Sequence, residues 1–252
     1  MPRILALHAH PDDIETLAAG TLALLAAAGH EVAIVTATAG ECGSTEFTPE
    51  QTGPIRQGEA AEAAAMIGAS YGCVGLPDLG VFNDDASRRR VTEAVRAARP
   101  DIVITAAPAD YHPDHETISL LVRDACFASS APNYRTGPAA ALSAMPHLYF
   151  TDPIGGRDRQ GQPVPPHFAV DITAVFETKR AMLACHRSQT EWLAKQHAVT
   201  DPLAAMTALG RKRGREHGVA QAEGFRQYRH EPYPTSPLLQ ELLGAAVMKV
   251  ES

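Results

Sequence analysis

The feature that most constrains the fold is a regular alternation of short apolar runs with longer alanine-rich segments over the first half of the chain. The apolar runs predict buried strands at 4–8, 31–36, 73–76 and 101–105. The intervening segments predict helices at 16–28, 55–67, 86–98 and 116–128. Strands that alternate with helices of this length pair in parallel through right-handed crossovers. We therefore expect an α/β fold with a Rossmann-like, doubly wound and mostly parallel sheet.

The second half of the chain is less regular. Apolar runs predict two further strands at 147–150 and 167–172, followed by a long helical stretch through residue 208. The C-terminal segment 230–250 has a proline-rich entry and then an apolar helix, which we expect to dock on its own domain or on another subunit. The length of 252 residues suits one domain, with 1–130 as its core of βα units and 131–252 as an addition.

Charge and motif content argue against two classes of function. The formal net charge of −7 gives no electrostatic footprint for nucleic-acid binding. Two basic clusters, at 88–90 and 211–215, are typical of solvated helix faces. The G-x-G-x-x-G fingerprint is absent after the first strand, which argues against a nicotinamide-dependent Rossmann enzyme.

Cysteine usage and the N-terminus bear on the cellular compartment. The cysteines lie far apart and form no C-x-x-C pair; they are Cys42, Cys73, Cys126 and Cys185. This pattern predicts reduced thiols rather than a disulfide scaffold. No signal peptide is visible, and the longest apolar stretch, 17–28, is too short to span a bilayer. We expect a cytoplasmic protein with no membrane partner.

Two short motifs rich in histidine and aspartate follow predicted strands. HPDD at 10–13 comes after the first strand, and HPDH at 112–115 follows the strand at 101–105. In an open α/β sheet, ligands bind beyond the carboxyl ends of the strands. We therefore expect the fold to bring these two motifs to one edge of the sheet, where they form a site.

The residue types in these motifs suit metal-assisted hydrolysis. The candidates are His10, Asp12, Asp13, His112, Asp114 and His115. Catalytic zinc commonly has three protein ligands drawn from histidine and carboxylate, and leaves one position for water. A carboxylate off the metal can take the proton of that water, and a second histidine can stabilise the oxyanion or protonate the leaving amine. Spacing alone does not distinguish the liganding aspartate from the base.

The same motifs carry a family resemblance. AHPDDIE at 9–15, the following AGTLALLAAAGHEVAIVTATAGE and HPDH at 112–115 resemble the GlcNAc-PI de-N-acetylase (PIG-L) and LmbE-like family. The likeness continues more weakly into KRAMLACHRSQ at 179–189 and AEGFR at 222–226. Relatives often have Glu directly after the Asp pair, whereas this chain has Ile14 and then Glu15.

The resemblance assigns roles that the spacing leaves open. It implies that His10, Asp13 and His115 are zinc ligands and that Asp12 is the general base. It further implies that His112 assists catalysis at the oxyanion or at the leaving group. Fe²⁺ is an alternative to zinc, because metal affinity alone does not decide between them.

Four further residues receive a role from the same resemblance. Asp114 would orient His112, and Arg56 would contact the substrate. Asp78 corresponds to a position that binds sugar hydroxyls, and His186 lies where relatives have a histidine or tyrosine near the site. On sequence grounds alone, Arg56 could equally be a surface residue in a first helical turn. His186 could pack on a helix face.

The motif residues also have simpler explanations. Asp12 and Asp13 could cap the following helix, since aspartate is favoured there. His112 and His115 could be an exposed pair on a loop. His8 lies inside the first predicted strand, and we interpret it as a packed core histidine. Because both motifs converge on one sheet edge, we favour the site over these explanations taken one by one.

These observations lead to one leading hypothesis. We expect a zinc-dependent hydrolase that removes an N-acetyl group from an N-acetylated amino sugar or its conjugate by metal-activated water. The alternatives are an amidase acting on a larger or thiol-linked conjugate and a non-catalytic relative that binds a metal or ligand. The long loops 39–54 and 152–166 would set selectivity. The resemblance also implies a homo-oligomer, such as a trimer or hexamer.

Overall fold

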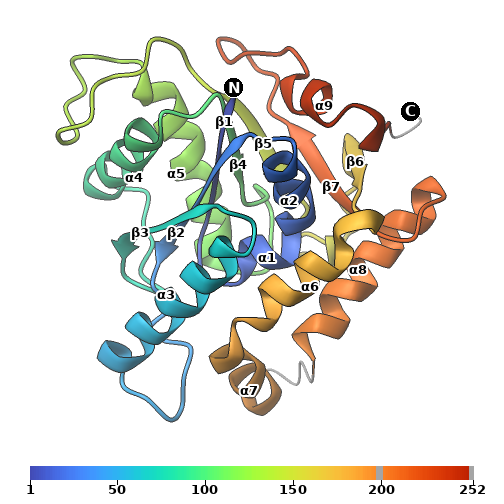
Figure 1. Cartoon of the computed structure of the whole chain (residues 1–252). Helices are drawn as coiled ribbons and strands as arrows, with labels where there is room; N and C mark the ends of the chain where they lie inside the picture. The colour runs from blue at the N-terminus through green and yellow to red at the C-terminus, as the bar shows by residue number, and fades with distance from the viewer. Residues whose placement is uncertain (197–200, 250–252) are drawn as a thin grey trace.

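The computed structural model describes residues 1–196 and 201–249, and its centre is an eight-stranded sheet (Figure 1). The strands are β1 (Arg3–His8), β2 (Glu31–Thr38), β3 (Ser70–Leu76), β4 (Ile102–Thr105), β5 (His147–Thr151), β6 (Phe168–Asp171), β7 (Ala222–Gln227) and β8 (Val247–Lys249). Their order across the sheet is β3-β2-β1-β4-β5-β7-β6-β8. The first five are parallel to one another, whereas β7, β6 and β8 pair in antiparallel fashion. The predicted mostly parallel α/β sheet is confirmed.

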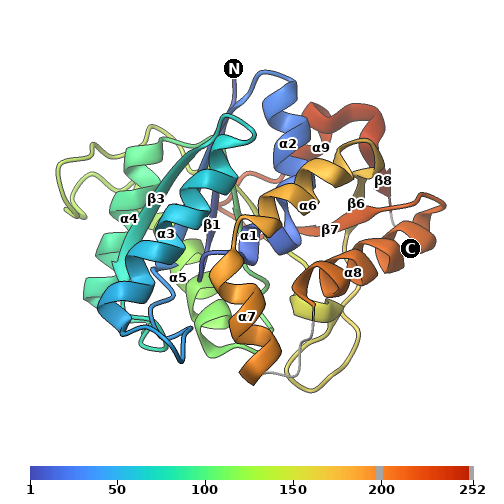
Figure 2. The same ribbon diagram turned by 60° about the horizontal axis from the view of Figure 1, so that its bottom comes forward.

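Helices cover both faces of this sheet (Figures 1 and 2). They are α1 (Asp13–Leu17), α2 (Ala19–Ala27), α3 (Pro49–Ala65), α4 (Asp85–Ala98), α5 (Pro113–Ser129), α6 (Phe176–Ala184), α7 (Arg187–Gln196), α8 (Pro202–His217) and α9 (Leu238–Leu243). Alternate β1 residues serve the two faces, as the period of a strand requires. Ile4 and Ala6 pack with α1, α2, α3, α6 and α9, whereas Leu5 and Leu7 pack with α4 and α5.

The predicted helix at 16–28 is two helices, with a break at Ala18. Ala18 has φ −139°, outside the helical range. Glu223 of β7 reaches this break and accepts hydrogen bonds from the backbone N–H groups of Gly20 (2.9 Å) and Thr21 (2.7 Å). The same carboxylate forms a buried ion pair with Lys179 of α6. An anion at the start of α2 satisfies free amide groups and complements the helix dipole.

Two helices begin earlier than the sequence suggested. α3 begins at Pro49 rather than 55, because Thr48 and Gln51 form a capping box there, and Pro54 lies inside the helix. The loop before it is therefore shorter than predicted. α5 begins at Pro113, which suits a first helical position because proline lacks the N–H group. As a result, the second half of the HPDH motif lies in a helical turn and not in a loop.

The second half differs most from prediction. Strands β7 and β8 were not predicted as strands, and the helical stretch expected through residue 208 is divided into α6, α7 and α8; residues 197–200 lie outside the described part. The apolar C-terminal helix is short, and α9 packs on the chain's own core beside α2. Docking on its own domain is thus confirmed.

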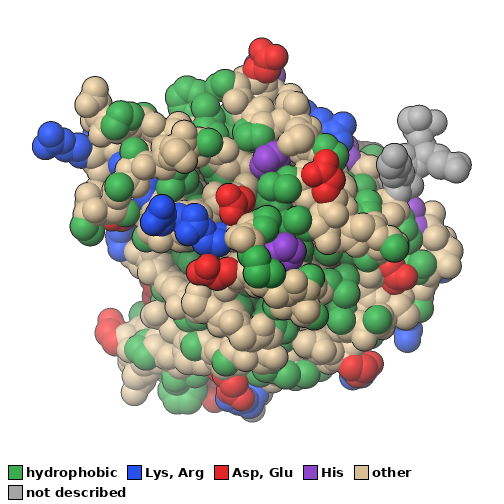
Figure 3. Space-filling model, turned by 45° about the horizontal axis from the view of Figure 1, so that its top comes forward, with side chains coloured by type: hydrophobic (Ala, Val, Ile, Leu, Met, Phe, Trp, Pro, Cys, Tyr) green, Lys and Arg blue, Asp and Glu red, His purple; other side chains and the backbone are tan. Residues whose placement is uncertain are grey.

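The described surface and helices show two further features. On the face shown in Figure 3, basic side chains lie close to acidic ones and are interspersed with apolar residues. Over residues 1–196 and 201–249, no helix combines the length and apolar character that a membrane span requires. All four cysteines are free thiols, as predicted.

Candidate metal centre

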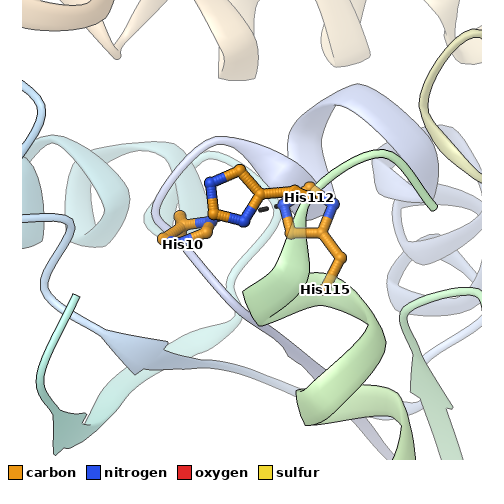
Figure 4. Close-up of side chains that lie close together, drawn as sticks. All are labelled: His10, His112 and His115. Atoms are coloured by element: carbon orange, nitrogen blue, oxygen red, sulfur yellow. Dashed lines mark hydrogen bonds between the residues drawn. The ribbon is translucent and has the colours of Figure 1, made fainter. Parts of the chain in front are cut away.

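The two histidine and aspartate motifs meet at the carboxyl ends of adjacent parallel strands. β1 ends at His8, and its residue Leu7 pairs with Thr105, the last residue of β4. The chain then passes from β1 into α1 and from β4 into α5. His10 lies between β1 and α1, whereas His112 and His115 lie at the start of α5; Figure 4 shows the three rings close together. The predicted convergence at one sheet edge is therefore present.

Three side chains, those of His10, Asp13 and His115, form a compact triangle that suits one metal ion, with both oxygens of the Asp13 carboxylate close to the imidazoles. His115 Nε2 lies 3.3 Å from His10 Nδ1 and 3.2 Å from Asp13 Oδ1. His10 Nδ1 lies 3.4 Å from Asp13 Oδ2. Ligand atoms about 2.0–2.1 Å from a tetrahedral zinc ion are separated by roughly 3.3 Å. The separations between these three groups are therefore in the range that a divalent ion requires.

Three other groupings of side chains at this edge also lie close enough to share an ion. They are His10, His112 and His115; His8, Asp13 and His115; and His10, Asp78 and Asp114. Each grouping includes a member of the triangle, so all describe one centre from different sides. We favour the triangle because His10 Nε2, His115 Nδ1 and Asp13 Oδ2 each have another partner. His10 Nδ1, His115 Nε2 and Asp13 Oδ1 are therefore the atoms left for an ion.

His10 presents one ring nitrogen to the triangle and the other to two carboxylates. Its Nε2 atom lies 3.3 Å from Asp114 Oδ2, a hydrogen bond, and 3.1 Å from Asp78 Oδ1. Burial alone would lower the pKa of His10, but its bonds to Asp114, Asp13 and Asp78 raise that pKa well above the ordinary value. A proton held at Nε2 leaves Nδ1 free to bind metal, the arrangement typical of liganding histidines.

His115 has its own carboxylate partner, which sequence reasoning missed. Its Nδ1 atom lies 3.2 Å from Asp110 Oδ1. Burial would lower the pKa of His115, but Asp13 and Asp110 raise it to about 9. Asp110 itself is held by the backbone N–H groups of His112 and Ile154. Its position in the same loop, two residues before HPDH, was the available signal.

His8 supports the carboxylate of Asp13. It is buried, as predicted for a core histidine, but its Nδ1 atom lies 2.7 Å from Asp13 Oδ2. The same oxygen accepts a hydrogen bond from the backbone N–H of His10 at 2.8 Å. Burial would raise the pKa of Asp13, but the neighbouring His115 and His8 hold it well below the usual range. His8 is therefore part of the site, beyond simple packing.

The backbone of Asp12 is strained, and its side chain does not cap the following helix. It occupies the N-cap position of α1 with φ 103°, yet its side chain makes no capping bond. Left-handed backbone at a residue with a side chain is unfavourable and is often found at functional sites. Burial raises the pKa of this carboxyl more than Arg56 lowers it. The capping explanation for Asp12 is therefore wrong, and its carboxylate lines the cavity.

Arg56 is buried, which excludes a surface role. Its guanidinium donates hydrogen bonds to the carbonyl oxygens of Gly40 (2.8 Å) and Pro11 (2.7 Å), and it lies 3.3 Å from Asp12 Oδ2. Gly40 has φ +66°, and a Cβ there would collide with the guanidinium. Arg56 thus fixes the backbone around Asp12 while its side chain lines the cavity.

His112 is oriented by a backbone group, which corrects the role expected for Asp114. The Nδ1 atom of His112 accepts a hydrogen bond from the N–H of Asp114 at 3.2 Å. The carboxylate of Asp114 instead contacts His10 and accepts the N–H of Leu79 at 2.8 Å, because the first turn of α5 aims it there. Burial, together with the nearby His10 and His115, lowers the pKa of His112. Its Nε2 atom is left as a neutral donor.

His186 lies between α6 and α7, so the expected packing on a helix face is wrong. It is buried and lines the cavity, with Nε2 at 3.4 Å from Glu15 Oε2. Burial would lower the pKa of His186, but the carboxylates of Glu15 and Asp12 raise it. Glu15, one residue beyond the place where relatives have their Glu, therefore also belongs to the site.

A cavity of about 530 Å³ opens onto the metal centre. Both long loops contribute to its lining, through Cys42 and Gly43 of the first and Ile154 of the second. Asp78, at the end of β3, also lines it and accepts the N–H of Cys42 at 2.9 Å. The cavity lies within the range of about 300–1,000 Å³ that encloses small ligands.

Comparisons with known proteins relate the chain to one family and to two kinds of enzyme. The model of the GlcNAc-PI de-N-acetylase family matches residues 5–126. The 1D-myo-inositol 2-acetamido-2-deoxy-alpha-D-glucopyranoside deacetylase of Nakamurella multipartita is 29% identical, over 93% of this chain and 92% of its own length. The 4-oxalmesaconate hydratase of Pseudomonas putida is 28% identical, over 73% of each chain.

A solved structure resembles the whole fold. The crystal structure of a conserved protein from Thermus thermophilus superposes with a TM-score of 0.75 at 30% identity. The alignment covers 94% of this chain and 100% of that one. The likeness therefore includes the second half, which lies beyond the residues matched by the family model.

Proposed function

The chain belongs to the GlcNAc-PI de-N-acetylase (PIG-L) and LmbE-like family, and from this premise we propose that it is a divalent-metal hydrolase that removes an N-acetyl group from an amino-sugar conjugate. The observation that supports this most is the triangle of His10, Asp13 and His115 with the strained Asp12 beside it. Deacetylase relatives with N-acetylated sugar substrates support the class of bond.

His10, Asp13 and His115 would hold the ion, with zinc as the proposed metal and Fe²⁺ as the alternative. When bound, such an ion polarises a carbonyl and lowers the pKa of water towards 7. The chain provides the rest. Asp78 and Asp114 keep the proton of His10 on Nε2, and the buried site excludes competing water from the ligand atoms.

Asp12 would act as the general base. Its carboxylate lies outside the triangle, and its raised pKa makes it a better proton acceptor near neutral pH than an ordinary aspartate. Asp12 takes a proton from the attacking water while Arg56 holds its carboxylate in place. The strain at Asp12 is consistent with this fixed orientation.

His112 would act on the other side of the reacting carbon. Because its Nδ1 atom accepts a hydrogen bond, its Nε2 atom carries the proton and can donate to the developing oxyanion. Its lowered pKa keeps the ring neutral at pH 7. The proton that Asp12 takes up then passes to the departing amine, so the products are acetate and a free amino sugar.

The second candidate is hydration of a carbon–carbon double bond, which the hydratase relative raises. The names of such substrates denote carboxylates, which need cationic partners. Among the described residues that line the cavity, Arg56 is the single arginine or lysine, and it is already bonded to Gly40, Pro11 and Asp12. Besides the proposed ion and His186, the described lining residues therefore offer no free cation to the several carboxylates of such a substrate, and a neutral amide suits this cavity better. A non-catalytic metal protein is disfavoured, because the centre opens onto the cavity.

The test is release of acetate. Protein loaded with zinc or Fe²⁺ is incubated with methyl, aryl and inositol glycosides of N-acetylglucosamine, and free amine and acetate are measured. We expect stoichiometric amine and acetate from at least one conjugate. Absence of amide cleavage in all of them, combined with hydration of an unsaturated carboxylate, would overturn the proposal in favour of the second candidate.

A further inference from the structure

The cavity has two walls of different chemistry. The wall at the sheet edge holds the imidazoles and carboxylates of the metal centre. The facing wall is built by the end of α6, by α7 and by the start of α8, and its apolar residues are Leu183, Trp192, Pro202, Leu203 and Ala205. Figures 1 and 2 show α7 and the start of α8 beyond the carboxyl ends of the parallel strands. We name this second surface the α7–α8 wall.

Two exposed apolar side chains lie at the cavity beside the metal centre. Leu79 is 62% exposed and Tyr111 is 66% exposed, and both line the cavity. Leu79 has φ 58°, a left-handed conformation that disfavours a side chain, and its N–H is held by Asp114. The Tyr111 ring stands edge-on to His112, with 5.7 Å between centroids. Large apolar side chains that are exposed together beside a cavity are typical of ligand-binding surfaces.

The α7–α8 wall offers little to a charged group. Among the described lining residues from 183 to 205, the titratable side chain is His186, which faces Glu15 and Asp12. A phosphate or carboxylate against this wall would lose water without gaining a counter-charge. The remaining polar groups there are the neutral Gln189 and Thr190.

We propose that the substrate carries an apolar group of about six or more carbons next to its scissile amide, and that this group lies against the α7–α8 wall. The inference rests on the proposed function, since amide hydrolysis defines which part of the substrate meets the metal centre. The cavity of about 530 Å³ has room for such a group beyond an acetamido sugar. Apolar burial predicts that kcat/KM rises roughly three- to four-fold for each added methylene.

The apolar group could be attached at either end of the amide. It could be the acyl chain, or it could be the aglycone of an N-acetylated sugar. Two substrate series distinguish these sources. One varies the acyl group of glucosamine from acetyl to hexanoyl and octanoyl, and the other varies the aglycone of N-acetylglucosamine from methyl to hexyl and octyl. A rise of at least ten-fold in kcat/KM along one series identifies the source.

Binding can be followed without turnover, because Trp192 is the sole tryptophan of the chain. Octyl and methyl glycosides, kept below the micellar concentration, are titrated into the Asp12→Asn variant while tryptophan fluorescence is recorded. We expect the octyl compound to shift the emission of Trp192 and to bind at least ten-fold more tightly than the methyl compound.

Variants of the apolar surface test its contribution. Leu203→Ser and Leu79→Gly should each reduce the octyl-to-methyl preference by about three-fold or more. Leu79→Gly also relieves the left-handed strain, so a change in preference cannot be attributed to unfolding. The matched control is Phe82→Ala, because Phe82 is also exposed and in the same loop but does not line the cavity; it should leave the preference unchanged.

The outcomes separate the inference from the function on which it rests. Flat rates along both series, with the methyl glycoside cleaved as fast as the octyl one and bound as tightly, would overturn the inference and leave the deacetylase proposal intact. Absence of amide cleavage in every compound would overturn the proposed function. Tight octyl binding to the Asp12→Asn variant in that case would still support the apolar surface.

Discussion

The two halves of the molecule differ in what they bring to the cavity. The parallel half, through α5, contains the proposed metal-binding triangle, Asp12, His112 and the carboxylates beside them. The half with the antiparallel strands contributes the α7–α8 wall, His186 and the loop after β5. The family model matches residues 5–126, which lie within the parallel half. In the proposed function, the parallel half therefore performs the chemistry, and the half with the antiparallel strands selects the substrate.

Removing the metal should have the largest effect and would test whether the parallel half holds the ion. We expect dialysis against a chelator to abolish amide hydrolysis and to lower the melting temperature, because an ion bound to the folded state stabilises it. Zinc should restore both. Circular dichroism should show that the fold persists without metal. Full activity in metal-free protein would show that the parallel half does not hold an ion needed for catalysis.

Asp12→Asn should be nearly as severe. Loss of a general base lowers turnover by about 10²- to 10⁴-fold. The metal content should remain near that of the wild type, because Asp12 lies outside the triangle. The measurement is kcat with metal analysis of the same sample. If the variant also lost its metal, Asp12 would be a ligand and the proposed division of roles with Asp13 would be wrong.

Lys179→Met tests the buried ion pair that holds Glu223, the residue through which the second half bonds to the start of α2. Removing one partner of a buried ion pair leaves Glu223 uncompensated, which costs about 3 kcal/mol of stability. The matched control is Arg180→Met on the same helix, whose exposed ion pair with Glu177 should contribute less than about 1 kcal/mol. Denaturant unfolding measures both. Equal effects of the two variants would show that this buried ion pair contributes no more to stability than the exposed one.

Asp110→Asn sharpens the description of the metal centre. Loss of the carboxylate beside His115 Nδ1 should weaken metal binding by about 10- to 100-fold, as at other sites where an outer partner is removed. Competition with a chromophoric chelator gives the affinity. Asp124→Asn on the surface of α5 is the control and should leave it unchanged. An unaffected Asp110→Asn protein would remove Asp110 from the site.

The smallest expected effect is on the pH dependence of stability without metal. The pKa of His115 is raised to about 9 in the folded protein, above its unfolded value of about 6.5. Its contribution is therefore fully present below pH 6.5 and is lost as the pH rises through 9. Melting temperatures of metal-free protein should fall over this window more steeply than those of Asp110→Asn. Parallel curves would contradict the assigned partner.

Sequence reasoning was most successful where burial is uniform. The inner parallel strands β1, β4 and β5 are buried along nearly their whole length because helices cover both faces, and so their pattern is readable without a partner. β7 was missed because its sequence, AEGFRQ, contains the buried Glu223 and Gln227. Their polar atoms are satisfied by Lys179, α2 and Ser236, contacts that arise only in the folded chain.

The site shows the same limit at a smaller scale. The motifs indicated which residues converge, and the resemblance suggested which aspartate faces the ion. The second ring nitrogen of each proposed histidine ligand faces a carboxylate about 3 Å away, and spacing along the chain does not reveal which carboxylate that is. Asp110 and His8 were therefore missed as supporting groups, and Asp114 was paired with His112 rather than with His10.

The bond from Glu223 to the start of α2 has a consequence for engineering. α2 follows α1, which begins at Asp13, so an antiparallel strand late in the chain anchors the helix pair that carries a proposed metal ligand. The halves are thus poor candidates for exchange between relatives as independent modules. A chimera that imports a new C-terminal portion to change selectivity would need to retain both Glu223 and Lys179, or the recipient would lose the anchor of its own active-site helices.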